Sequence, residues 1–121
     1  MSNSIKLALV ALLFASACKS GPDPQIHTMI GAKLASAQPT IQDCFQSSLT
    51  TNRKLRGMMV LQMAVNEKGE FVDISTRRDE PNDPVLRFCV TKAFAALKLD
   101  KAPGARVQLD SVPVKFEWTK P

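Results

Sequence analysis

Three cysteines carry the most distinctive chemistry of this chain, and each stands in a different sequence context. Cys18 follows a short apolar stretch at the start of the chain, whereas Cys44 and Cys89 lie in the part with ordinary globular patterning. A thiol can form a disulfide, bind a metal or carry a covalent modification. None of the three belongs to a C-x-x-C pair, so the spacing indicates neither a zinc site nor thiol exchange.

Residues 1–18 read "MSNSIKLALVALLFASAC" and have the three parts of an export signal, with Lys6 before an apolar run and small residues before Cys18. The run is shorter than the about 20 residues that span a bilayer, so we expect cleavage. The tetrad "ASAC" resembles a bacterial lipobox. This resemblance implies a diacylglycerol on the Cys18 thiol and usually a fatty acid such as palmitate on its amine. The alternative is ordinary cleavage after Ala17, which leaves a free thiol.

The residue after Cys18 is Lys19 rather than Asp, which by analogy with other bacterial lipoproteins favours a periplasmic protein anchored to the outer membrane. The following "KSGPDPQ" contains glycine and prolines but no core residues, and predicts a tether of at most about 25 Å. We therefore expect a signal peptide over 1–17, a lipidated cysteine and tether over 18–25, and a folded domain over 26–121. The chain would contact the lipid bilayer through the acylated Cys18.

Assigning Cys18 to lipid leaves Cys44 and Cys89 as an even pair. The periplasm is oxidising and permits a disulfide between them. Two buried free thiols are the alternative, because cysteine packs well in cores. We favour a structural disulfide.

Other groups capable of catalysis are few. His27 is the only histidine and lies beside the tether, so no Ser-His or Cys-His dyad is indicated. The segment "RRDEPND" over 77–83 gathers carboxylates, but a solvated turn with a helix cap explains it better than a weak cation site. No nucleotide-binding glycine motif is present. We expect no enzyme, no cofactor and no metal.

The chain has a net charge of +5, from 16 Lys and Arg against 11 Asp and Glu, but the charges are mixed along it. A nucleic-acid-binding protein usually shows a longer basic stripe with interleaved aromatics, so we expect no nucleic-acid partner. The short clusters are solvated surface that could steer an acidic protein partner. They contain Arg53, Lys54 and Arg56 in "NRKLR", and Arg77 and Arg78 in "TRR".

Hydrophobic periodicity predicts an α+β fold in the order helix, strand, strand, helix, strand. Residues 26–54 are mostly helical and are interrupted at Pro39, which leaves two short helices or one kinked helix. An alternating hairpin follows around "NEKGE", and "NDPVLRFCVTKAFAALKL" begins a helix with Asp83 as its cap. A three-stranded antiparallel sheet with two helices on one face satisfies this pattern. Both Cys44 and Cys89 fall on the apolar stripes of those helices, which favours their pairing.

The last strand, "RVQLDSVPVKFEW", changes the parity of its apolar residues near Ser111. Such a change predicts a bulge or a slip in pairing. Pro113 has no N–H, so we expect this strand at an edge of the sheet.

Residues 41–116 resemble the AgmX/PglI C-terminal domain of myxobacterial gliding-motility envelope proteins and, more distantly, the C-terminal domain of TonB. The resemblance rests on "IQDCFQSSL", "LRGMMVLQMAVNEKGEFVDIS", "NDPVLRFCVTKAFAALKL" and "VPVKFEW", with "KAPG" as a departure after the second helix. It implies a non-catalytic interaction domain that binds another cell-envelope protein, and strand addition at a sheet edge is the mode we expect. A structural or peptidoglycan-associated lipoprotein is the alternative, and a role in motility stays open.

Overall fold

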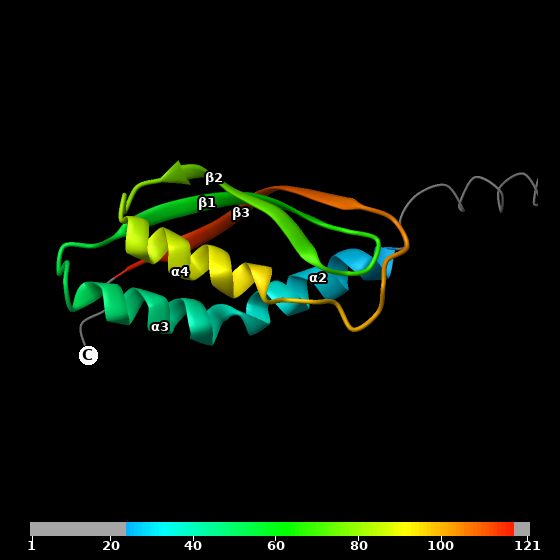
Figure 1. Ribbon diagram of the computed structural model, residues 1–121, viewed down its shortest axis with the longest axis horizontal. Helices are drawn as coiled ribbons and strands as arrows, with labels where there is room; N and C mark the ends of the chain where they lie inside the picture. The colour runs from blue at the N-terminus through cyan, green and yellow to red at the C-terminus, as the bar shows by residue number, and fades with distance from the viewer. Residues whose placement is uncertain (1–23, 118–121) are drawn as a thin grey trace, which may run out of the picture.

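The computed structural model describes residues 24–117, which form one three-stranded antiparallel sheet covered by helices on one face (Figure 1). The strand order is β2-β1-β3. The predicted α+β fold is confirmed, and the N-terminal helical region consists of two separate helices. In chain order the elements are α2 (Pro24–Ser36), α3 (Gln38–Leu49), β1 (Gly57–Val65), β2 (Phe71–Asp79), α4 (Pro84–Ala95) and β3 (Val107–Phe116).

The predicted signal peptide, Cys18 and most of the tether lie outside the described residues. Helix α2 begins at Pro24, so Pro24 and Gln25 of the expected tether belong to its first turn. Within residues 24–117, no helix is long and apolar enough to cross a membrane.

The central strand β1 separates a buried face from an open face. Met59, Leu61 and Met63 are fully buried against the helices, whereas Met58 and Gln62 are partly exposed on the other side. This is the predicted alternation of a half-covered sheet. Phe94 of α4 is also buried. The largest buried side chains include Phe45, Phe94, Met59, Leu61, Met63, Leu86, Val65 and Val90.

Strand β3 carries the predicted bulge. Its pairing with β1 shifts between Leu61 and Met63, whose partners are Val112 and Leu109. One extra residue on β3 therefore lets both Leu109 and Val112 face the helices, although their sequence parity differs. The parity change near Ser111 is explained in this way.

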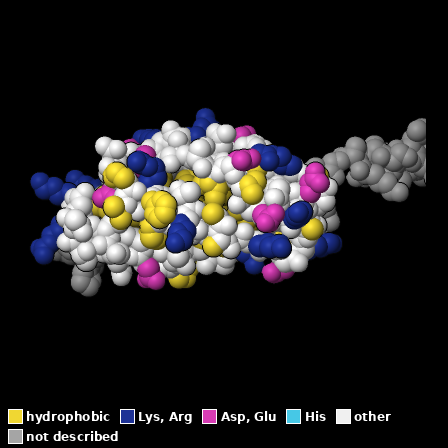
Figure 2. All heavy atoms as spheres, in the orientation of Figure 1, with side chains coloured by type: hydrophobic (Ala, Val, Ile, Leu, Met, Phe, Trp, Pro, Cys, Tyr) yellow, Lys and Arg dark blue, Asp and Glu magenta, His cyan; other side chains and the backbone are white. Residues whose placement is uncertain are grey.

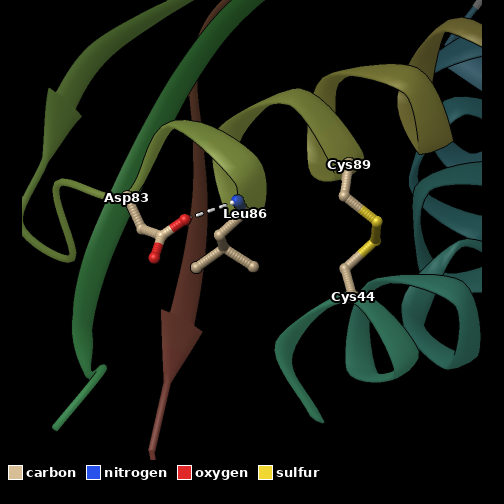
Figure 3. The surroundings of a disulfide bond; sticks show 4 residues. All are labelled: Cys44, Asp83, Leu86 and Cys89. Atoms are coloured by element: carbon tan, nitrogen blue, oxygen red, sulfur yellow. Dashed lines mark hydrogen bonds between the residues drawn. A yellow bond between two sulfur atoms is a disulfide. The ribbon is translucent and has the colours of Figure 1, made fainter. Parts of the chain in front are cut away.

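Helix α4 begins as predicted. The Asp83 carboxylate accepts a hydrogen bond of 2.9 Å from the Leu86 N–H, and Pro84 is the first helical residue (Figure 3). The cap satisfies an amide that has no partner inside the helix, and proline at this position has no amide to satisfy.

A disulfide joins Cys44 of α3 to Cys89 of α4, with a Cα–Cα distance of 5.8 Å (Figure 3). The predicted pairing is confirmed. On the same helix, the ring of Phe45 packs against Phe116 of β3, with a centroid separation of 5.1 Å. Helix α3 is thus tied to α4 by a covalent bond and to the last strand by an aromatic contact.

Removing the disulfide should lower the unfolding free energy by about 4 kcal/mol, because the bond closes a sequence separation of 45 residues. Denaturant unfolding of the oxidised and the reduced protein measures this difference. The variant Cys44→Ala/Cys89→Ala should resemble the reduced protein and should not respond to reductant. Equal stability of the oxidised and reduced proteins would contradict the assignment.

Candidate functional site

A groove of about 440 Å³ follows β3 on the side of helices α2 and α3. One wall is the strand from Val112 to Phe116, and Phe94 of α4 completes the lining. The opposite wall combines the end of α2 with the start of α3. Its residues are Leu34, Ala35, Gln38, Ile41 and Gln42.

The junction of α2 and α3 shapes the helical wall of this groove. Pro39 has no N–H, so the helical hydrogen bond from residue 39 to residue 35 cannot form. The chain turns at Ala37, whose N–H donates to the Leu34 carbonyl over 3.1 Å and whose side chain is buried. The last turn of α2 and the first turn of α3 consequently both face β3.

Of the two edges of the sheet, β3 offers the longer regular stretch of backbone. Its residues 112–116 pair without interruption with residues 61–57 of β1. Strand β2 has two register shifts against β1, and Asp73 within it has a φ of 54°. An extended segment that paired with β3 would direct alternate side chains toward the groove. The edge position predicted from Pro113 is confirmed.

Three of the five predicted partner-binding cations lie together in the loop between α3 and β1. Arg53, Lys54 and Arg56 are exposed, and none of them forms an ion pair within residues 24–117. This loop lies at the end of the molecule where β3 also ends (Figure 1), and basic side chains project from that end in Figure 2. The loop therefore presents uncompensated positive charge next to one end of the groove.

The other two predicted cations are engaged within the fold. Arg77 Nη1 donates to the Asp110 carbonyl over 2.9 Å, which links β2 to β3 across the central strand. Arg78 forms an ion pair of 2.7 Å with Glu80. The structure therefore does not join the five residues into one basic patch.

Glu80 fastens the end of β2 to the beginning of β1. Its Oε1 accepts the Met58 N–H over 2.7 Å, and its own N–H donates to the Met58 carbonyl over 3.0 Å. The hydrogen bond from Met58, followed by the Arg78 guanidinium, lowers the pKa of the Glu80 carboxyl. Gly57 has a φ of 127°, and a Cβ there would lie 2.7 Å from the Glu80 Cβ, so this approach requires glycine.

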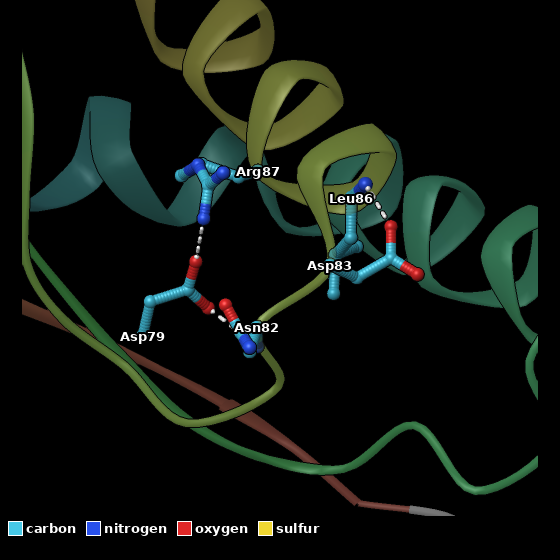
Figure 4. A network of polar contacts seen from close by, with 5 residues as sticks. All are labelled: Asp79, Asn82, Asp83, Leu86 and Arg87. Atoms are coloured by element: carbon cyan, nitrogen blue, oxygen red, sulfur yellow. Dashed lines mark hydrogen bonds and ion pairs between the residues drawn. The ribbon is translucent and has the colours of Figure 1, made fainter.

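The acidic segment after β2 is built from separate local contacts (Figure 4). Asp79 pairs with Arg87 and accepts the Asn82 N–H over 3.0 Å, while Asp83 caps α4. Among the residues that the structure describes, no group of three or more His, Cys, Asp and Glu side chains is placed to hold a metal ion. His27 is exposed on α2.

Sequence reasoning missed two exposed apolar residues. Val85 is 71% exposed and Phe88 is 70% exposed, and they are the only large hydrophobic side chains so exposed within residues 24–117. Their exposure could have been predicted from the sequence, because both residues fall outside the apolar stripe of α4. The contribution of Leu34 and Ala35 to the groove was also missed, since it depends on how α2 meets a distant strand.

No family model matches the chain, and no curated protein matches it. Among solved structures, the NMR solution structure of the Helicobacter pylori TonB-CTD is similar. The two chains are 15% identical, the similarity covers 85% of this chain and 100% of that one, and the TM-score is 0.47. This likeness concerns the fold alone.

The lowered pKa of Glu80 predicts that the contact between β1 and β2 at this residue depends on pH. Because the folded pKa lies below the usual value near 4.5, the carboxylate stabilises the fold above that pH and loses this effect as the pH falls through the folded value. An NMR titration should place the Glu80 midpoint below 4.5. Arg78→Gln should raise the midpoint only in part, because the Met58 hydrogen bond is the larger cause. A midpoint at or above the usual value would contradict the contact.

Proposed function

We propose that this chain is a membrane-anchored periplasmic lipoprotein whose domain binds another cell-envelope protein and performs no catalysis. The observation that carries the proposal is the free edge of β3 beside the groove between that strand and α2–α3. The resemblance of residues 41–116 to AgmX/PglI and TonB C-terminal domains agrees with a binding role.

The binding mode that we propose is strand addition. An extended segment of the partner would pair its main chain with residues 112–116, the regular part of the β3 edge. Alternate side chains would enter the groove between Ile41 of α3 and Val112 of β3. Exposed backbone supplies affinity in this mode, and the groove supplies selectivity.

Pro113 supports a selective rather than an indiscriminate edge. It contributes no N–H to this edge, so a strand placed there meets one carbonyl without the matching donor. Natural proteins use proline on edge strands to limit unspecific pairing. A partner must therefore compensate for this missing backbone hydrogen bond through side-chain contacts in the groove.

The α3–β1 loop supports an acidic partner. Arg53, Lys54 and Arg56 are exposed and lack ion pairs among residues 24–117, so their field is not cancelled locally. Complementary charge mainly raises the association rate and is weakened by salt. Acidic residues just beyond the paired segment would meet this loop at the end of β3.

The arrangement of titratable side chains supports binding over catalysis. In the described part of the chain, Asp79, Glu80 and Asp83 each have a structural partner of their own. A general base needs a positioned partner or a substrate contact in a pocket. His27 is exposed, does not line the groove and forms no ion pair within residues 24–117.

A photo-crosslinking residue in place of Gln42, which lines the groove, should capture a defined envelope protein in living cells. The same residue in place of Ser75, exposed on β2 at the other edge of the sheet, is the matched control. Ala35→Phe should fill the groove and reduce the adduct by about tenfold, whereas Ala32→Phe on the same helix should not. Equal capture at positions 42 and 75, or none, would contradict the proposal.

The same assay tests the basic loop. Replacing Arg53, Lys54 and Arg56 with Gln should lower the capture rate and remove its salt dependence. Replacing Lys68, Lys98 and Lys101 with Gln removes the same charge elsewhere on the surface and should have little effect. Equal losses in the two variants would assign the effect to net charge alone.

Mass spectrometry of the mature protein without reduction tests the anchor. We expect cleavage after Ala17, lipid mass on Cys18 and an intact bond between Cys44 and Cys89. Cys18→Ser should release the protein from the membrane fraction, because stable anchoring needs the acyl chains. An uncleaved leader on the isolated protein would overturn the proposed anchor.

A further inference from the structure

An apolar patch lies on the outer side of α4, away from the proposed groove. It consists of Val85 and Phe88, which are separated by one helical turn and are 71% and 70% exposed. Figure 2 shows hydrophobic side chains on the face of the molecule over α4. These two side chains form a small apolar surface in a domain that buries its other large hydrophobic residues, and what it contacts depends on its surroundings.

The turn that presents this patch is held in place on several sides. Asp83 caps it, the ion pair of Arg87 with Asp79 ties it to β2, and the disulfide at Cys89 ties it to α3 (Figures 3 and 4). The exposure of Val85 and Phe88 is therefore part of a fixed surface.

A cation that forms no ion pair within residues 24–117 lies next to the patch. Helix α4 contains no acidic residue, and Lys92 lies on its exposed side one turn beyond Phe88. Of the two nearby carboxylates, Asp79 is paired with Arg87, whereas Asp83 accepts the Leu86 N–H and keeps its negative charge on the side of the first turn. Apolar side chains next to a cation that can reach headgroups are typical of helices that lie in a membrane interface.

We propose that this patch rests on the lipid bilayer, with Val85 and Phe88 in the interface and Lys92 directed to anionic headgroups. The inference rests on the proposed anchor at Cys18. Residues 19–23 between that cysteine and α2 extend at most about 20 Å, so the domain stays beside the membrane. At the resulting high local concentration, a small patch is sufficient to orient the domain.

This orientation leaves the groove open. Helix α4 packs against α3 and β2, whereas the groove lies along β3, at the other edge of the sheet. One side of the domain can therefore contact lipid while the free edge of β3 faces the periplasm.

Quenching by brominated lipid tests the contact directly. The chain has one Trp and no Tyr, so Phe88→Trp combined with Trp118→Phe leaves a single indole as reporter. The acylated protein is placed in vesicles of phosphatidylethanolamine and phosphatidylglycerol with brominated chains. Emission should fall to about half or less, since the apolar side of an interfacial helix enters the boundary by about 5–10 Å. Gln108→Trp in the same background, exposed on β3, should keep its emission.

The experiment distinguishes a failure of this inference from a failure of the proposed anchor at Cys18. Where isolated protein carries no acyl chain, its Cys18 thiol, left free by the disulfide between Cys44 and Cys89, is coupled to a maleimide lipid in the same vesicles. Quenching at position 88 and not at position 108 supports the inference with either attachment. Unquenched emission from position 88 on attached protein overturns it. Shielding of position 88 in whole envelopes, but not in pure lipid vesicles, would assign the patch to a protein and also overturn it.

Discussion

The covalent bond between Cys44 and Cys89 determines how the helical layer is assembled. Helix α3 packs chiefly against α4, and α4 in turn packs against β2. Helix α3, which forms part of the groove wall, is cross-linked to α4 by the disulfide. The contact between Phe45 and Phe116 then sets α3 against the last strand. A domain of this size has a modest core, and the cross-link compensates by restricting the unfolded chain.

Local chemistry explains most of what the sequence predicted. The alternation around Met59, Leu61 and Met63, the cap at Asp83 and the edge position of Pro113 depend on neighbouring residues or on one missing N–H. The pairing of Cys44 with Cys89 followed from the helical stripes on which both residues lie. In each case, the period of the pattern or the geometry of the backbone leaves few alternatives.

The features that escaped prediction depend on contacts between distant segments. Arg77 finds its acceptor, the Asp110 carbonyl, in the bulge of another strand. The groove exists because the α2–α3 junction faces β3, which no local pattern specifies. Cations that look equivalent in sequence consequently differ in the fold. Arg77 and Arg78 have partners, whereas the cations of the α3–β1 loop do not.

The disulfide and the proposed export signal agree in the compartment that they imply. A bond between two helices persists in an oxidising compartment and is rare where thiols are kept reduced. The proposed leader with its lipobox-like end would direct the chain to such a compartment, and the remaining pair of cysteines would then be free to cross-link the helical layer. An unmodified Cys18 thiol on the same chain could attack the disulfide if the helices separated during folding. Modifying that thiol would remove the competing reaction, so the anchor would protect the bond on which the groove wall depends.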